Sequence, residues 1–127
     1  MFTVTIETQF KASHSVALPN GSREPQHDHF WAVTAEVSAD KLDDKGMVID
    51  FAQVNARLNG ITSQLSGAVL NDVDYFRENG STAEKVALYI FEKLEPNLPG
   101  SVRLQSVTVS EQVGCSAKYA KDTRPRM

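Results

Sequence analysis

The three histidines of this 127-residue chain are its clearest chemical signal. His27 and His29 stand two residues apart in "QHDHFWAV", and His14 lies in "FKASHSV". Residues i and i+2 of a β-strand point to the same side, so His27 and His29 can converge on one point. His14 can reach that point if the two segments pair as a hairpin. An H-x-H pair alone is also common on polar surfaces, but all three histidines of the chain lie in adjoining segments. The sequence therefore predicts a zinc site with three imidazoles and an open fourth position.

Alternating apolar and polar side chains predict the strands that carry these histidines. Residues 2–10 alternate, and so do residues 29–38, in which Trp31, Val33, Ala35 and Val37 share one face. The segment "LPNGSREP" between them is dense in turn residues and predicts a long loop. Two further strands are predicted at 102–111 and 115–120.

Two helices are predicted between the second and third strands. Asp50 with Gln53 three residues later is typical of a helix start, and an apolar stripe follows at Phe51, Val54, Leu58, Ile61 and Leu65. Ser81 with Glu84 predicts a capping box for a second helix, which "EPNLPG" ends. Residues 66–80 between the helices are predicted to form a loop.

The resulting order, ββααββ, indicates an α+β fold in a single domain spanning residues 1–127. Its four strands can form one antiparallel sheet with both helices on one face. Both edges and the second face of such a sheet remain to be covered, which favours a homo-oligomer.

Composition excludes several classes of function. The formal net charge of −3 argues against a nucleic-acid-binding protein, and the longest apolar run, "VALYIF", is too short to span a membrane. The single cysteine, Cys115, excludes an internal disulfide, and the N-terminus leads directly into a strand pattern without an export signal. We therefore expect a cytoplasmic protein.

The sequence resembles the 6-pyruvoyl-tetrahydropterin synthase and 6-carboxy-tetrahydropterin synthase family over nearly its whole length. The resemblance is carried by "FKASHSV", "HDHFWAV", "GMVIDF", "VLND", "STAEKVALYI" and "VTVSE", in this order. It implies the tunnelling fold, in which three subunits close their sheets into a barrel and two trimers stack, so the expected oligomer is a trimer-based hexamer. It also implies that His14, His27 and His29 match the zinc ligands of the family.

The resemblance further implies a pocket for a pterin-like molecule. Glu111 in "VTVSE" matches the pterin anchor, and a carboxylate can accept both the ring N–H and the neighbouring amino group of a pterin. The segment "STAE" matches the pocket wall, where Thr82 can offer a hydroxyl and backbone groups. Glu84 is a further candidate for substrate binding, although helix capping also accounts for it.

The proton relay of the family is missing. The cysteine that acts as its base has no counterpart in "NGSREPQ", and its aspartate–histidine pair is replaced by Ser66 and Gly67, which cannot relay protons near neutral pH. Glu24 is the one titratable candidate for a catalytic base beside the histidines, and family members with a glutamate in this region resemble enzymes that cleave the pterin side chain. As a loop charge between Arg23 and Pro25, however, Glu24 is expected to face solvent.

Three functions follow from these residues. The leading prediction is a pterin-binding member of the family without the standard synthase reaction. The first alternative is a zinc-dependent lyase that cleaves the side chain of dihydroneopterin triphosphate or a related pterin. The second is an oligomeric scaffold with a vestigial pocket.

Overall fold

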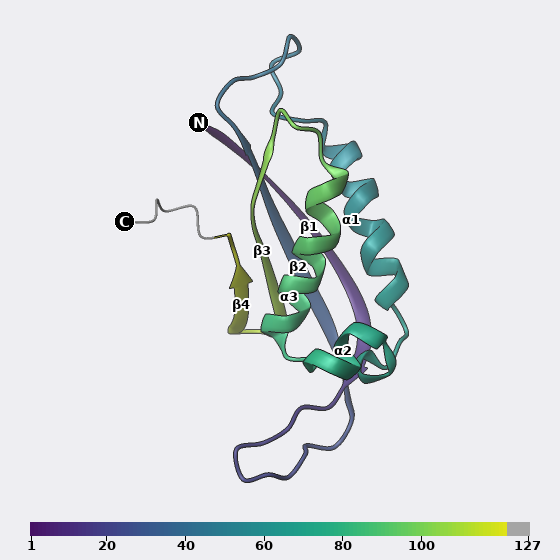
Figure 1. Cartoon of the computed structure of the whole chain (residues 1–127). Helices are drawn as coiled ribbons and strands as arrows, with labels where there is room; N and C mark the ends of the chain where they lie inside the picture. Colours follow the sequence, from purple (N-terminus) through teal and green to yellow (C-terminus); the bar gives the residue numbers. More distant parts are fainter. Residues whose placement is uncertain (122–127) are drawn as a thin grey trace, which may run out of the picture.

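Four strands form a single antiparallel sheet in the computed structural model, which describes residues 1–121. The strands are β1 (Phe2–His14), β2 (His27–Ala39), β3 (Arg103–Gln112) and β4 (Cys115–Tyr119), and they are ordered β1-β2-β3-β4 (Figure 1). The predicted α+β class and the single four-stranded antiparallel sheet are confirmed. Strands β1 and β2 are longer than predicted, because their pairing continues as far as His14 and His27.

The helices cover one face of this sheet (Figure 1). Helix α1 (Phe51–Leu65) packs on β1, and α3 (Ala83–Leu94) packs on β3 and β4. The side chain of Asp50 accepts a hydrogen bond from the Ala52 N–H, which confirms the predicted start of α1. A 3-10 turn, η2 (Glu95–Asn97), follows α3 directly.

The segment between the two long helices differs from the prediction. Residues 66–80 contain a 3-10 turn, η1 (Leu70–Asp72), and a short helix, α2 (Asp74–Asn79), instead of a continuous loop. Each of these elements contributes only one buried side chain, Leu70 and Phe76 respectively. One apolar anchor in a short segment produces no helical periodicity, so the pattern gave no sign of α2.

The start of α3 also differs from the prediction. The N-cap is Thr82, whose hydroxyl accepts a hydrogen bond from the Lys85 N–H at 3.2 Å. The hydroxyl of Ser81 instead donates to a different part of the chain. With Thr82 as the cap, the third helical position is Lys85, so Glu84 does not complete a capping box.

The core lies between the helices and the inner face of the sheet. Trp31, Val33, Ala35 and Val37 of β2 are all fully buried there, as their alternation predicted. The opposite face of β1 carries Thr3, Thr5, Glu7 and Gln9, of which all are exposed. That face is polar and compatible with water, so the free edges of β1 and β4 are the stronger reason to expect other subunits. Among the described residues, no helix is long and apolar enough to cross a membrane.

Candidate functional site

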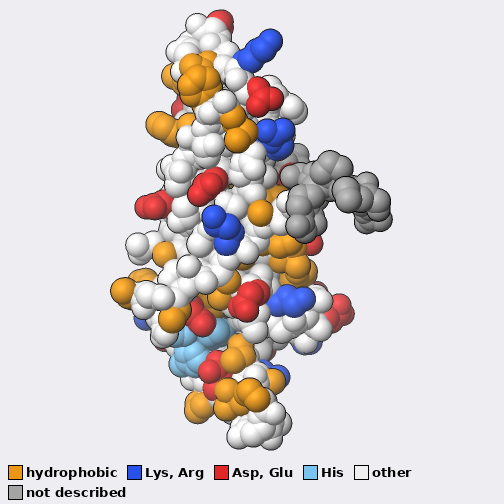
Figure 2. Space-filling model, turned by 90° about the vertical axis from the view of Figure 1, so that its left-hand side faces the viewer, with side chains coloured by type: hydrophobic (Ala, Val, Ile, Leu, Met, Phe, Trp, Pro, Cys, Tyr) orange, Lys and Arg blue, Asp and Glu red, His pale blue; other side chains and the backbone are white. Residues whose placement is uncertain are grey.

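The β1–β2 hairpin brings the three predicted histidines together. His14 pairs with His27 in the strand register, and Ala12 pairs with His29. One ring nitrogen from each histidine lies within 4.8 Å of the others, and the rings meet edge to face with centroids 4.5–5.1 Å apart. Figure 2 shows histidine side chains gathered at the lower end of the molecule with acidic side chains beside them. The convergence predicted from the H-x-H spacing and the hairpin is therefore present.

Backbone carbonyls set the tautomers of two of the rings. Nδ1 of His14 is 2.8 Å from the carbonyl oxygen of Ser81, and Nδ1 of His27 is 2.8 Å from that of Pro25. A carbonyl only accepts, so each Nδ1 carries a proton and donates it. Each neutral ring then presents the lone pair of Nε2 to the cluster, which is the orientation that metal-binding histidines usually have.

Glu111, at the end of β3, directs one carboxylate oxygen into the histidine cluster. Its Oε2 lies 3.0 Å from Nε2 of His14 and 3.6 Å from Nε2 of His29. Both His14 Nε2 and Glu111 Oε2 are buried, and within residues 1–121 they are not aligned for a hydrogen bond with any group. Two buried lone pairs that face each other are costly unless a proton or a cation lies between them. Three neutral imidazoles are a donor set that suits Zn²⁺ and leaves a fourth position open, so His14, His27 and His29 fit the predicted metal.

Burial keeps His29 ready to bind a metal. Desolvation lowers the pKa of His29 from its ordinary value of 6.5, although Glu111 acts in the opposite direction; His27 and His14 add to the lowering, while Glu24 opposes it more weakly. The neutral imidazole, which is the form that binds a metal, is therefore favoured at neutral pH.

Glu24 turns toward the histidines and not toward solvent. The N–H of Val16 donates to Glu24 Oε1 at 3.1 Å, and the Glu24 N–H donates to the Val16 carbonyl at 3.0 Å. The hydroxyl of Ser15 also donates to the Glu24 carbonyl, at 2.6 Å. Held in this way, Glu24 Oε1 lies 3.7 Å from Nε2 of His27 and 4.0 Å from Nε2 of His14. The expectation of a solvent-facing Glu24 is wrong, because the loop folds back on Val16 and carries the carboxylate inward.

Two pockets adjoin this cluster of histidines and carboxylates. One, of about 910 Å³, is lined by residues that include Glu24, Ser81 and Thr82. The other, of about 390 Å³, is lined by residues that include Glu84 and Glu111. Because Glu24 and Glu111 both approach Nε2 of His14, the cluster lies between the two spaces. The hydroxyl oxygen of Thr82 accepts the capping hydrogen bond from the Lys85 N–H, and the side chain of Glu84 is exposed.

Ser66 and Gly67 hold the end of α1 against β1. Ser66 ends α1, where its N–H donates to the Thr62 carbonyl, and the Gly67 N–H donates to the Lys11 carbonyl of β1 at 2.7 Å. Gly67 has a φ of 77°, a conformation that glycine adopts most easily. These two residues connect α1 to β1 and offer no group for proton transfer.

Sequence reasoning did not single out Asn71 and Ser81 as site residues. Asn71 in η1 and Ser81 before α3 are joined by a hydrogen bond, and the Ser81 carbonyl accepts from His14. The only signal was that "VLND" and "STAE" were among the segments that carried the family resemblance.

The protein has a four-stranded antiparallel sheet with helices on one face, and three histidines lie at the end of its first hairpin. Together these features define a tunnelling-fold protein. The chain belongs to the 6-pyruvoyl tetrahydropterin synthase family, whose model matches residues 3–122.

Individual relatives agree with this assignment. The chain is 29% identical over 108 residues to the dihydroneopterin monophosphate aldolase of Pyrococcus furiosus, an alignment that covers 85% of this chain and 88% of that protein. The structure of Caenorhabditis elegans 6-pyruvoyl tetrahydropterin synthase superposes with a TM-score of 0.80 at 25% identity, covering 96% of this chain and 98% of that one. A catalytic-residue variant of the Plasmodium vivax 6-pyruvoyltetrahydropterin synthase superposes with a TM-score of 0.78 at 20% identity, covering 95% and 98%, and this likeness supports the fold alone.

Proposed function

We propose that the protein is a metal-dependent lyase of the aldolase type that cleaves the side chain of a reduced pterin. The observation that carries this proposal is the position of Glu24, whose carboxylate lies within 4.0 Å of Nε2 of both His14 and His27. A tethered carboxylate beside three metal-binding imidazoles is a suitable general base. The relationship to the Pyrococcus furiosus aldolase supports the same reaction.

The chemistry required of such a base is simple. Dihydroneopterin and its phosphates carry hydroxyl groups on the first and second carbons of the side chain. Glu24 removes the proton of the second hydroxyl, the bond between these two carbons breaks, and its electron pair passes into the ring imine beside the first carbon. The proton held by Glu24 then returns to the first carbon. The products are a hydroxymethyl pterin and glycolaldehyde, or its phosphate when the substrate is phosphorylated.

The histidines and the two glutamates divide the remaining tasks. His14, His27 and His29 hold the cation, and a bound Zn²⁺ supplies Lewis-acid stabilisation of negative charge on a substrate oxygen. In this proposal Glu111 accepts the ring N–H and the amino group of the pterin, and it lines the 390 Å³ pocket together with Glu84. Thr82 contributes to the wall of the larger pocket.

The working form in this proposal is a homo-oligomer built on trimers, most simply a hexamer. Its support is the sheet itself, in which β1 and β4 are edge strands that a second copy can pair. A stable monomer at micromolar concentration in light scattering would contradict it.

A second candidate function is binding of a pterin without turnover. The observation that favours it is the absence of the relay of the family, since Ser66 and Gly67 occupy structural positions between α1 and β1. Pterin binding through Glu111 is common to both candidates, so only product analysis separates them.

The test is to incubate zinc-loaded protein with dihydroneopterin, its monophosphate and its triphosphate and to separate the products by chromatography. The proposal expects a hydroxymethyl pterin together with glycolaldehyde or its phosphate. A pyruvoyl or carboxy tetrahydropterin formed at ordinary enzymatic rates would contradict it. Binding of these compounds in calorimetry with no product would support the second candidate.

A further inference from the structure

The amide of Asn71 joins three segments of the chain behind the metal site. Its Oδ1 accepts the Ser15 N–H at 2.9 Å, and its Nδ2 donates to the Ser15 carbonyl at 2.9 Å. Its Oδ1 also accepts the hydroxyl of Ser81 at 3.2 Å. Because an N–H must donate and a carbonyl must accept, these partners determine which way round the amide lies. Asn71 therefore links η1 to the residue after β1 and to the residue before the cap of α3.

Ser81 transmits this arrangement to a metal ligand. Its hydroxyl is held by Asn71 and, at 3.3 Å, by the Ser15 carbonyl, while its own carbonyl accepts the Nδ1 proton of His14 at 2.8 Å. Ser81 and His14 are almost entirely buried, with 1% and 2% of their surfaces exposed. Few other groups can replace these bonds at such a depth.

We propose that Asn71 is a positioning residue of the metal site, which holds the Ser81 carbonyl where it fixes the tautomer and orientation of His14. The inference rests on the metal site proposed above. Without the amide, the Ser15 N–H and the Ser81 hydroxyl lose a buried partner, and the Ser81 segment is free to move. The His14 ring can then place its proton on Nε2, the nitrogen that must stay free to bind the cation.

Two measurements on the Asn71→Ala variant test this inference. Long-range proton–nitrogen NMR of the metal-free protein identifies the protonated ring nitrogen of His14. The wild type is expected to show Nδ1–H, and the variant a mixture of both tautomers. Titration with Co²⁺ reports affinity and ligand geometry through its visible absorption, and the affinity of the variant is expected to fall about 10- to 100-fold, as is typical when a partner of a metal ligand is lost.

Matched variants separate positioning from general damage. Ser81→Ala keeps the carbonyl that His14 needs and removes only the hydroxyl, so its effect should be smaller than that of Asn71→Ala. The double variant should lose less Co²⁺ affinity than the two single losses multiplied together, because both act through one contact. Asn97→Ala removes an amide that donates to the Lys93 carbonyl near the end of α3, and it should change neither measurement.

Several outcomes would overturn the inference. One is an Asn71→Ala variant that keeps the Nδ1–H tautomer and the wild-type Co²⁺ affinity. Another is a variant whose only defect is a higher KM, since Asn71 also lines the 910 Å³ pocket and would then be a substrate contact. If Asn71→Ala does not fold, the same two measurements are made on Asn71→Ser, which keeps a hydroxyl at the site. A wild type that binds no Co²⁺ would refute the metal site, and the His14 tautomer would then decide the role of Asn71 alone.

Discussion

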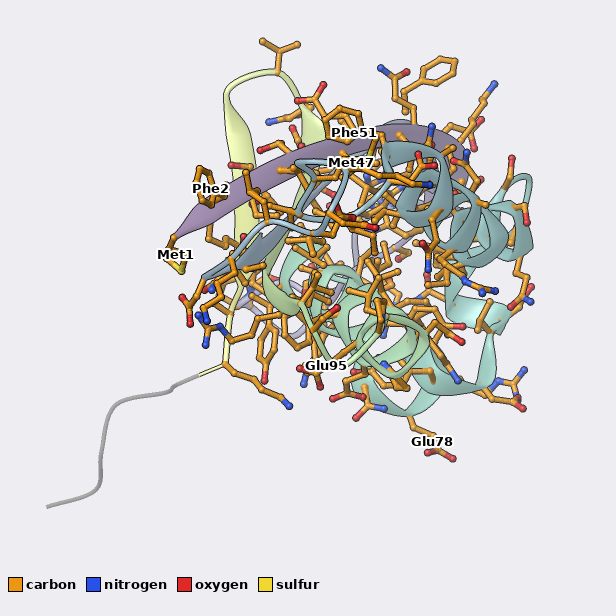
Figure 3. All side chains as sticks on the ribbon, turned by 90° about the horizontal axis from the view of Figure 1, so that it is seen from above. Met1, Phe2, Met47, Phe51, Glu78 and Glu95 are labelled. Atoms are coloured by element: carbon orange, nitrogen blue, oxygen red, sulfur yellow. The ribbon has the colours of Figure 1, made fainter. Side chains whose placement is uncertain are left out.

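The two ends of the sheet are built in opposite ways. At the end where β1 passes into the loop before β2, several of the buried groups are polar, among them His14, Ser15 and Ser81. At the other end several large apolar side chains are exposed beside charged ones, and Figure 3 views the molecule from that side. There Phe2, Leu42, Met47 and Phe51 are between 41% and 62% exposed and line a pocket of about 410 Å³. We call these two regions the histidine end and the apolar end.

This difference indicates what each end does. Burying polar groups costs free energy unless they are paired. Two atoms at the histidine end, His14 Nε2 and Glu111 Oε2, lack a hydrogen-bond partner in the part of the chain that the structure describes. Such a cost is expected where a ligand or metal completes the pairing. Exposed apolar side chains at the other end have no polar atoms to direct chemistry, and they suit contact with another surface. Changes at the histidine end should therefore affect chemistry and folding together, whereas changes at the apolar end should affect neither strongly.

The largest effect is expected from Glu24→Gln. The amide keeps the shape of the side chain but cannot take a proton, so turnover should fall about 10²- to 10⁴-fold, the usual contribution of a positioned base. Metal content should stay near that of the wild type, as measured by elemental analysis. Glu78→Gln is the matched control, because Glu78 is exposed on the same 910 Å³ pocket and should be replaceable without loss. Equal losses in the two variants would remove Glu24 from the mechanism.

Trp31→Ala should give the largest loss of stability at the histidine end. The indole is fully buried, donates to the Ala12 carbonyl at 3.1 Å, and packs against the rings of His14 and His29 at 4.8 and 5.7 Å. Removing a buried aromatic side chain typically lowers the free energy of unfolding by about 3–5 kcal/mol. Urea denaturation measures this change. A loss below about 1 kcal/mol would show that the histidines do not depend on the indole for their support.

A smaller effect is expected from pH. Desolvation lowers the pKa of His29 below its ordinary value of 6.5, so the unfolded chain takes up a proton at a higher pH than the folded protein does. The unfolded state is therefore favoured progressively as the pH falls below about 6.5, and the metal-free protein should lose stability in that direction. Urea denaturation at a series of pH values checks this. His29→Gln should weaken the dependence of the free energy of unfolding on pH. If the free energy of unfolding depends on pH equally in His29→Gln and in the wild type, His29 is not the source of that dependence.

The smallest effect is expected at the apolar end. Phe51 is 62% exposed, so Phe51→Ser should change the free energy of unfolding by less than about 0.5 kcal/mol. Turnover and metal affinity should also remain those of the wild type. Denaturation, metal titration and a turnover assay on one preparation give all three quantities. A loss of turnover in Phe51→Ser would show that the two ends are coupled.

The sequence alone predicted the parts of the molecule that repeat a simple period. Alternation along 29–38 predicted that Trp31 and Val33 share a buried face, and the H-x-H spacing predicted that His27 and His29 share a side. The helix that begins after Asp50 was equally clear, because its cap and its apolar stripe agree. In all three cases backbone geometry alone decides which side chains face the same way, so neighbours in sequence carry the whole signal.

Contacts between distant segments determine what single side chains do where those segments meet, and the sequence pattern did not predict them. Glu24 faces the histidines because its loop pairs with Val16, and Thr82 caps α3 because the Ser81 hydroxyl is bound to Asn71 and Ser15. Asn71 is 56 residues from Ser15 in the chain, and no local pattern reports a contact over such a separation. A loop charge and a serine before a helix have ordinary local preferences, and here the buried hydrogen bonds of distant partners outweigh them.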